Sequence, residues 1–166
     1  MKTILFARHA KSNWNEPGTS DFERPLNEKG KIDAPLMAKY LQQCGYIIHE
    51  IISSDAARAL ATAEEYKKYL TPDIPVVQNH SIYAASELDI IDLIKLLPAN
   101  QSTVMIVGHN PTMTEVVNYY TEDGVSDMPA CSVAIVQYEV ANWEDIKIGS
   151  GDLLAFEYPK KHKKNI

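Results

Sequence analysis

The sequence predicts an α/β fold, a three-layer α/β/α sandwich around a mostly parallel central sheet. Two observations lead to this prediction. Segments with strand character alternate four times with segments of helical periodicity, which is the order of elements in connected parallel strands. The first strand is apolar on successive residues, from Ile4 to Ala7, as expected for a strand that is buried on both faces.

The strands are expected where runs of apolar and β-branched residues stand between turn signals. They lie at residues 4–7, 47–53, 76–77 and 103–107, followed by a late hairpin of 132–138 and 153–156. Helices are expected at residues 28–44, 56–69, 87–97 and 112–120. A polar loop over residues 11–24 separates the first strand from the first helix.

Polar residues mark the starts of three of these helices. Asn27 is expected to cap the first helix, and Ser54 or Asp55 the second. Ser86, with Asp89 three residues later, forms a capping-box pattern before the third. The 3-and-4 spacing of the first helix predicts a buried apolar stripe of Ile32, Leu36, Met37, Tyr40 and Leu41.

Length and composition limit the class of protein. The 166 residues are expected to form one domain over 1–159, with a basic, disordered tail at 160–166. The net charge of −6 argues against general nucleic-acid binding, which requires a basic surface. Two cysteines are too few for a disulfide framework, and no segment approaches the roughly 20 apolar residues of a membrane span. We therefore expect a cytoplasmic protein that binds neither membranes nor nucleic acid.

Four polar residues stand after the predicted strands. His9 follows the first strand, and Arg58 lies just after the second. Glu87 follows the third strand and His109 the fourth. Parallel strands place their carboxyl ends at one edge of the sheet, where the ligands of open α/β sheets bind. These four side chains are therefore expected to converge.

Two arginines make this edge suited to an anion. Arg58 is expected in the first turn of its helix, where the helix dipole favours an anion, so that Arg58 and the helix end face one bound group. The alternative is a surface cation that the helix tolerates. Arg8 adds a second fork of donors that fits phosphate oxygens.

The two histidines allow two interpretations. His9 and His109 are potential zinc ligands, but a zinc site needs further ligands close by and neighbouring arginines repel a dication. The same cations disfavour an imidazolium, so His9 is expected to be neutral, with the lone pair that a nucleophile needs. We therefore expect no metal at this edge.

A family resemblance rests on these residues. Arg8-His9-Ala10, with Ser12 and Asn15, resembles the first motif of the histidine phosphatase superfamily (branch 1), in which Arg-His-Gly is commonest. Ala10 departs from that form as in the short, single-domain SixA-type phosphohistidine phosphatases. Further matching segments extend the resemblance over nearly the whole chain, at residues 21–30, 53–64, 107–111 and 149–159. The resemblance implies a phosphoglycerate-mutase-like fold.

The resemblance also implies a role for the residues of the edge. His9 attacks phosphorus and becomes transiently phosphorylated. The phosphoryl oxygens are held by Arg8, Arg58 and His109, without a metal or another cofactor. Water then cleaves the phosphohistidine.

Three further residues have two interpretations each. Ser12 and Asn15 match the extended motif and either contact the phosphate or brace the loop. Glu87 is either the proton donor to the leaving group or a glutamate that the helix dipole favours at a helix start. SixA-type members lack a clear equivalent of that acid. Asp21 and Arg24 are expected to form a local ion pair.

The predicted activity is removal of the phosphoryl group from phosphohistidine on a partner protein of the histidine-containing phosphotransfer type. An imidazole leaving group, with a pKa of about 6.5, needs less help from an acid than an alkoxide. The short connection at residues 70–75 leaves no room for a lid domain, which fits a phosphoryl group carried on a protein. The alternatives are a phosphatase for small phosphomonoesters and a non-catalytic module that binds phosphate.

Overall fold

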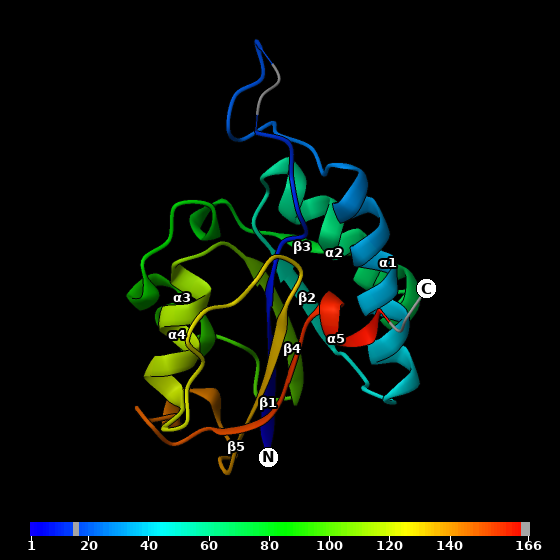
Figure 1. The fold of residues 1–166 in the computed structure, drawn as a ribbon. Helices are drawn as coiled ribbons and strands as arrows, with labels where there is room; N and C mark the ends of the chain where they lie inside the picture. Colours follow the sequence, from blue (N-terminus) through cyan, green and yellow to red (C-terminus); the bar gives the residue numbers. More distant parts are fainter. Residues whose placement is uncertain (15–16, 164–166) are drawn as a thin grey trace.

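The computed structural model describes residues 1–14 and 17–163, and a six-stranded sheet of order β3-β2-β4-β1-β5-β6 lies at its centre (Figure 1). Strands β3, β2, β4 and β1 are parallel to one another. Strand β5 runs antiparallel to β1, and β6 antiparallel to β5. The mostly parallel sheet is therefore confirmed.

The elements follow the predicted order, with ends displaced by a few residues. The strands are β1 Lys2–Arg8, β2 Glu50–Ser53, β3 Val77–Gln78, β4 Thr103–Gly108, β5 Val133–Tyr138 and β6 Asp152–Glu157. The helices are α1 Glu28–Gln43, α2 Ala57–Leu70, α3 Glu87–Lys95, α4 Thr112–Tyr120 and α5 Pro159–His162, with short 3-10 helices at His80–Ile82 and Trp143–Asp145. Within the described residues, no helix is both long enough and apolar enough to span a bilayer.

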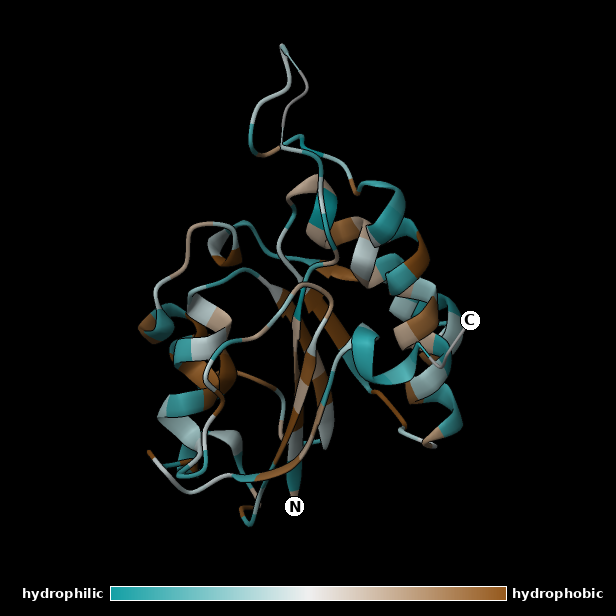
Figure 2. Ribbon diagram, in the orientation of Figure 1, coloured by the Kyte–Doolittle hydropathy of each residue, from teal (hydrophilic) through white to brown (hydrophobic). Residues whose placement is uncertain are grey.

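Helices cover both faces of the sheet, as the apolar β1 predicts. Ile4 and Phe6 are fully buried in the core on the side of α3 and α4. Leu5 and Ala7 belong to a second core on the side of α1 and α2. Figure 2 shows brown strands between two helical layers whose outer surfaces are largely teal or white. Burial of each large apolar side chain contributes about 1.5–3 kcal/mol, so both faces hold the layers together.

The predicted stripe of α1 is wrong at one position. Met37 and Leu41 are fully buried, but Ile32 faces the solvent, and 63% of its surface is exposed. Ala34 and Ala38 take the buried positions beside Met37 and Leu41. Two residues turn a helix by about 200°, so Ile32 lies opposite Ala34 and cannot share its face.

The predicted caps are confirmed at two of the three helices. The Asn27 side chain accepts from Gly30 N–H, and Ser86 forms the capping box before α3. The prediction for α2 is wrong, because its N-cap is Ala56, which offers no side-chain acceptor. Ser54 lies two residues before this N-cap, and its hydroxyl accepts from Ala56 N–H at 3.2 Å.

The chain end differs from the expected tail. Residues 159–162 form α5, and the His162 ring stacks on Tyr40 of α1 with 3.7 Å between centroids. Lys163 Nζ lies 2.6 Å from a carboxylate oxygen of Asp33, whose side chain is only 3% exposed. A buried carboxylate without a cation is energetically unfavourable, so the ion pair with Asp33 holds Lys163 and the end of α5 against α1. Residues 164–166 of the predicted tail lie outside the described residues.

The segment after β1 is held against the start of α1. The Lys11 carbonyl accepts from Asn27 N–H at 3.0 Å, and Ser12 forms an isolated antiparallel bridge with Leu26. A Cβ atom on Gly30 would lie 2.2 Å from the Lys11 oxygen, so the close approach requires glycine. Gly30 thus fixes the path of the chain directly after His9.

We expect Gly30→Ala to destabilise the protein by about 1–3 kcal/mol, because the new methyl group forces the Lys11 backbone away. Alanine has the higher helix propensity, so the steric term must exceed a gain of up to about 1 kcal/mol. The free energy of unfolding from urea denaturation measures the effect. Lys31→Ala, at the exposed neighbouring position, is the matched control. Equal stability of Gly30→Ala and the parent would contradict this close packing.

Candidate active site

Two histidines directly follow the carboxyl ends of the neighbouring parallel strands β1 and β4. Arg8 ends β1 and pairs in register with Gly108 at the end of β4, so His9 and His109 follow side by side. Their ring centroids are 5.1 Å apart. Arg58, the second residue of α2, donates from Nε to His9 Nε2 at 3.3 Å. The carboxyl edge of the sheet thus brings these residues together.

The hydrogen bonds of His9 define its tautomer. Nδ1 lies 2.7 Å from the Ala10 carbonyl oxygen, which is purely an acceptor, so Nδ1 carries the proton. The lone pair therefore sits on Nε2 and faces Arg58. Burial, together with the charges of His109, Arg58 and Arg8, lowers the pKa of His9 to about 3. His9 is consequently neutral near pH 7, as predicted.

Arg58 is held at both ends of its guanidinium. Nη1 donates to the Asp21 carbonyl at 2.7 Å, and Nη2 lies 3.2 Å from the Asp21 carboxylate. The same carboxylate accepts from Tyr83 Oη at 2.6 Å and pairs with Arg24 at 3.0 Å. The hydrogen bond from Tyr83, with those from Arg24 and Arg58, lowers the pKa of Asp21 to about 2. Asp21 is therefore ionised and orients Arg58 towards His9.

His109 and Arg8 retain nitrogen atoms for a ligand. His109 Nε2 lies 2.8 Å from Ser54 Oγ, while Nδ1 is buried without a hydrogen-bond partner among the described residues. Arg8 Nη1 donates to the Met128 carbonyl at 2.7 Å, and Arg8 Nε is likewise buried and unpaired in the described chain. Burial, followed by the charge of Arg58, lowers the pKa of His109 to about 4. An unpaired buried polar atom costs about 1–3 kcal/mol, so these atoms favour a bound oxyanion.

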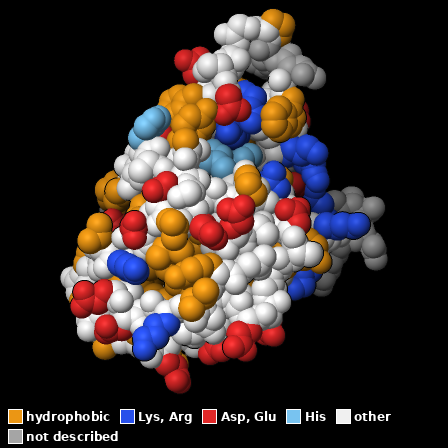
Figure 3. Space-filling model, turned by 90° about the vertical axis from the view of Figure 1, so that its left-hand side faces the viewer, with side chains coloured by type: hydrophobic (Ala, Val, Ile, Leu, Met, Phe, Trp, Pro, Cys, Tyr) orange, Lys and Arg blue, Asp and Glu red, His pale blue; other side chains and the backbone are white. Residues whose placement is uncertain are grey.

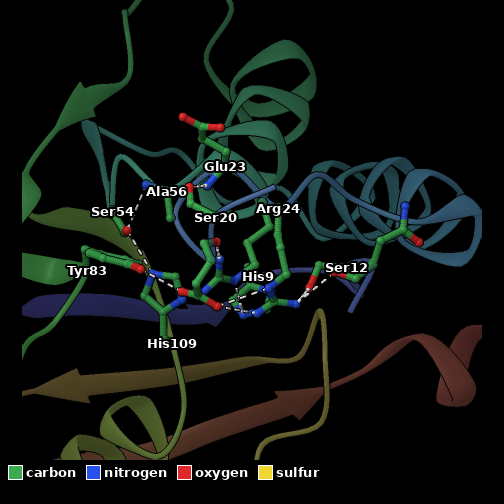
Figure 4. Close-up of polar contacts among 12 residues, drawn as sticks. His9, Ser12, Ser20, Glu23, Arg24, Ser54, Ala56, Tyr83 and His109 are labelled. Atoms are coloured by element: carbon green, nitrogen blue, oxygen red, sulfur yellow. Dashed lines mark hydrogen bonds and ion pairs between the residues drawn. The ribbon is translucent and has the colours of Figure 1, made fainter. Parts of the chain in front are cut away.

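A cavity opens beside these groups. It measures about 260 Å³ and is lined by Arg8, His9, Lys11, Ser12, Trp14 and Ala130. Figure 4 shows His9 and His109 close together, with Ser54 and Tyr83 to one side and Arg24 and Ser12 to the other. Among residues 1–14 and 17–163, no group of three or more His, Cys, Asp or Glu side chains is placed to hold a metal ion.

The sequence matches a known family at this site. The model of the histidine phosphatase superfamily (branch 1) matches residues 4–82, which include Arg8, His9 and Arg58. A solved structure assigned to the phosphohistidine phosphatase SixA of Agrobacterium tumefaciens is 27% identical, with a TM-score of 0.81 over 95% of this chain and 98% of that chain. Residues 4–82 therefore match the histidine phosphatase superfamily in sequence, and the whole chain resembles a SixA-type structure.

Two further similar proteins extend the likeness over nearly the full length of the chain. A structure of the protein histidine phosphatase SixA complexed with tungstate has a TM-score of 0.83 at 20% identity, covering 97% of this chain and 99% of that one. It shows the same fold. An uncharacterized protein of Mycobacterium tuberculosis is 26% identical over 163 residues, 92% of this chain and 99% of its own length. The phosphoglycerate-mutase-like fold is thus confirmed, and the family supports phosphatase activity.

Three predicted residues remain. Ser12 lines the cavity of His9, and its buried hydroxyl accepts from Arg24 Nη1, a contact that braces the loop. Asn15 lies outside the described residues. Glu87 begins α3, and its carboxylate makes no hydrogen bond or ion pair with any residue that the structure describes. Its role as an acid stays a prediction.

Sequence reasoning missed three supporting side chains. Tyr83 holds Asp21, and its ring edge packs on His109 with centroids 5.8 Å apart. Ser54 binds His109 instead of capping α2. Thr62 Oγ1 donates to the Arg58 carbonyl at 2.8 Å and accepts from Ala10 N–H at 2.9 Å. Tyr83, like Glu87, follows β3 and therefore lies at the carboxyl edge of the sheet. This position is the sequence signal that could have identified Tyr83 as a residue of the site.

The buried histidines predict a pH-dependent stability. In the unfolded chain a histidine binds a proton at a pKa of about 6.5, whereas His9 and His109 titrate at about 3 and about 4 when folded. Below pH 6.5 the unfolded state therefore binds more protons, and stability falls as the pH is lowered towards 4. We expect a loss of up to about 1.4 kcal/mol per pH unit for each histidine, measured by urea denaturation at several pH values.

The double variant His9→Gln/His109→Gln is the control for this effect. It removes both titrating groups, so its stability should depend less steeply on pH between about 6.5 and 4. A slope equal to that of the parent would show that other groups cause the loss.

Proposed function

We propose that this protein removes the phosphoryl group from phosphohistidine on a partner protein of the histidine-containing phosphotransfer type. The reaction passes through a covalent phosphohistidine on His9. The observation that carries this proposal is the neutral His9 Nε2 lone pair beside the guanidinium of Arg58, which Asp21 holds in place. A nucleophile and donors aimed at one point are what in-line phosphoryl transfer requires.

In the first step the lone pair of His9 Nε2 attacks phosphorus. The new N–P bond forms as the P–N bond of the substrate breaks, and the substrate imidazole keeps the bonding electron pair. When its other ring nitrogen carries a proton, it leaves as neutral imidazole. The His9 ring then becomes cationic, and the Ala10 carbonyl, which already accepts from Nδ1, stabilises that charge.

The positive groups act on the phosphoryl oxygens. Arg58 Nε turns from the His9 nitrogen, a long contact of 3.3 Å, to an oxygen of the transferring group. Arg8 Nε and His109 Nδ1 provide further donors. In the second step water attacks phosphorus, and inorganic phosphate and neutral His9 are released. The arginines provide the field that a metal ion supplies in other phosphatases, so we propose a metal-independent and cofactor-free reaction.

The state of Asp21 supports phosphohistidine over a phosphoester. An alkoxide leaving group needs a positioned acid, whereas imidazole leaves without one. Asp21 contacts Arg58, but its low pKa keeps it ionised and unable to donate a proton near pH 7. The chain between α2 and β3 is short, which leaves the cavity open to a group carried on a protein.

Small phosphomonoesters are a second candidate because of the position of Glu87. Thr112 Oγ1 donates to the Ala85 carbonyl at 2.7 Å, so the start of α3 lies beside the loop that follows His109. Glu87 is thereby on the same edge of the sheet. A modest movement of this segment would make Glu87 the acid for an alkoxide.

We expect His9→Ala to abolish hydrolysis of a phosphohistidine protein while the circular dichroism spectrum stays that of the parent. The parent should form an alkali-stable, acid-labile phosphoenzyme after a quench in denaturant at high pH, and the variant should form none. His49→Ala, at the opposite end of β2, is the matched control and should keep full activity. Turnover by His9→Ala at the parent rate would refute the nucleophilic role.

Glu87→Gln separates the two candidate substrates. We expect unchanged kcat/KM on phosphohistidine protein, because the imidazole needs no acid. Parallel assays with glycerol and sugar phosphates measure ester hydrolysis. If the parent hydrolyses these esters efficiently and Glu87→Gln lowers kcat/KM for them about 100-fold or more, Glu87 is the acid. Small phosphomonoesters then replace phosphohistidine protein as the substrate.

A further inference from the structure

A second cavity continues from the His9 cavity along the surface. It measures about 260 Å³ and shares Lys11 and Ala130 with the first. Its walls come from four separate parts of the chain: the loop after β1, helix α1 with Lys29 and Asp33, the segment before β5 with Ala130, and the C-terminal segment with Tyr158 and Lys160. We call this second cavity the lysine groove.

The lysine groove carries an excess of positive charge. Lys11 and Lys160 make no ion pair or side-chain hydrogen bond with any of the residues 1–14 and 17–163. Lys29 and Lys163 both lie near Asp33, at 3.7 and 2.6 Å, so two ammonium groups face a carboxylate of one charge. Within the described chain, the groove is therefore cationic although the whole protein carries a net charge of −6.

We propose that the lysine groove binds an acidic segment of the phosphorylated partner protein, next to its phosphohistidine. This inference rests on the proposed function. The groove shares Lys11 and Ala130 with the cavity of His9, so a chain whose phosphohistidine reaches His9 can place its neighbouring residues in the groove. Lysine side chains attract carboxylates, and Lys11, Lys29 and Lys160 come from three separate parts of the chain, which suits an extended polypeptide better than a compact metabolite.

The charge of the remaining surface reinforces this choice. An acidic partner is repelled by a protein of net charge −6 and attracted at its basic face, which orients the encounter. Figure 3 shows several Lys and Arg side chains to the right of the histidines, while Asp and Glu side chains are scattered over the rest of this face with a few further basic ones. The helix α5 presents Lys160 at this position because Lys163 and His162 anchor it on Asp33 and Glu157.

Two synthetic phosphohistidine peptides test the proposal. One has four glutamates on each side of the phosphohistidine, and the other has glutamines at the same positions. For Lys160→Glu we expect KM for the glutamate peptide to rise roughly tenfold at low salt, with kcat unchanged. KM for the glutamine peptide should not change, and the difference should vanish at high salt because surface charges are screened.

Lys147→Glu is the matched control, since it makes the same change in net charge at an exposed site in the loop before β6. An equal rise in KM for both variants would show a general charge effect and overturn the groove. If the parent hydrolyses both peptides with one KM, the groove proposal fails while the proposed function stands. If Lys160→Glu instead raises KM for small bisphosphate esters and leaves the glutamate peptide unaffected, the groove serves metabolites and the proposal fails.

Binding of the unphosphorylated glutamate peptide, measured by calorimetry, keeps the two proposals separate. We expect the parent to bind it more tightly than Lys160→Glu does, whether or not phosphohistidine is hydrolysed. Absence of turnover and of a phosphoenzyme would refute the proposed function alone. Equal binding by the parent and Lys160→Glu would refute the groove.

Discussion

The site depends on the parallel pairing of β1 with β4. His9 N–H donates to the Gly108 carbonyl at 3.1 Å, and the register Arg8 to Gly108 makes His9 and His109 the first residues beyond both strands. A shift of one residue would turn alternate side chains to the other face of the sheet and bury the wrong set. Because Ile4 to Ala7 fill two cores, the register cannot slip without loss of both.

The second constraint is electrostatic. Burial first, and then the charges of His109, Arg58 and Arg8 around it, keep His9 neutral. The same charges would repel one another without a counterion. The Asp21 carboxylate, held by Tyr83, provides it for Arg58 and Arg24 from the rim of the cavity. The geometry of Arg58 therefore depends on a residue in the loop rather than on the helix that carries it.

These constraints favour one kind of substrate. The carboxylate beside Arg58 is ionised, and a site of this kind works best on a leaving group that needs no proton from the protein. The lysine groove leads away from the same cavity. The proposed substrate, a phosphohistidine within an acidic protein segment, would satisfy both features: its phosphoryl group would contact the arginines, and its carboxylates would contact the lysines.

The sequence by itself determined the order of elements, the parallel sheet and the gathering of His9, Arg58 and His109 at its edge. The elements follow from the periodicity of apolar residues within short segments. The common edge follows from the general geometry of connected parallel strands. Tertiary structure alone decided that Tyr83 and Asp21 hold Arg58, that Ser54 serves His109 and that Lys160 lies beside the cavity. Each of these contacts joins residues distant in the chain, and its partner is chosen by packing and by the demand of buried charges for counterions, which no local pattern records.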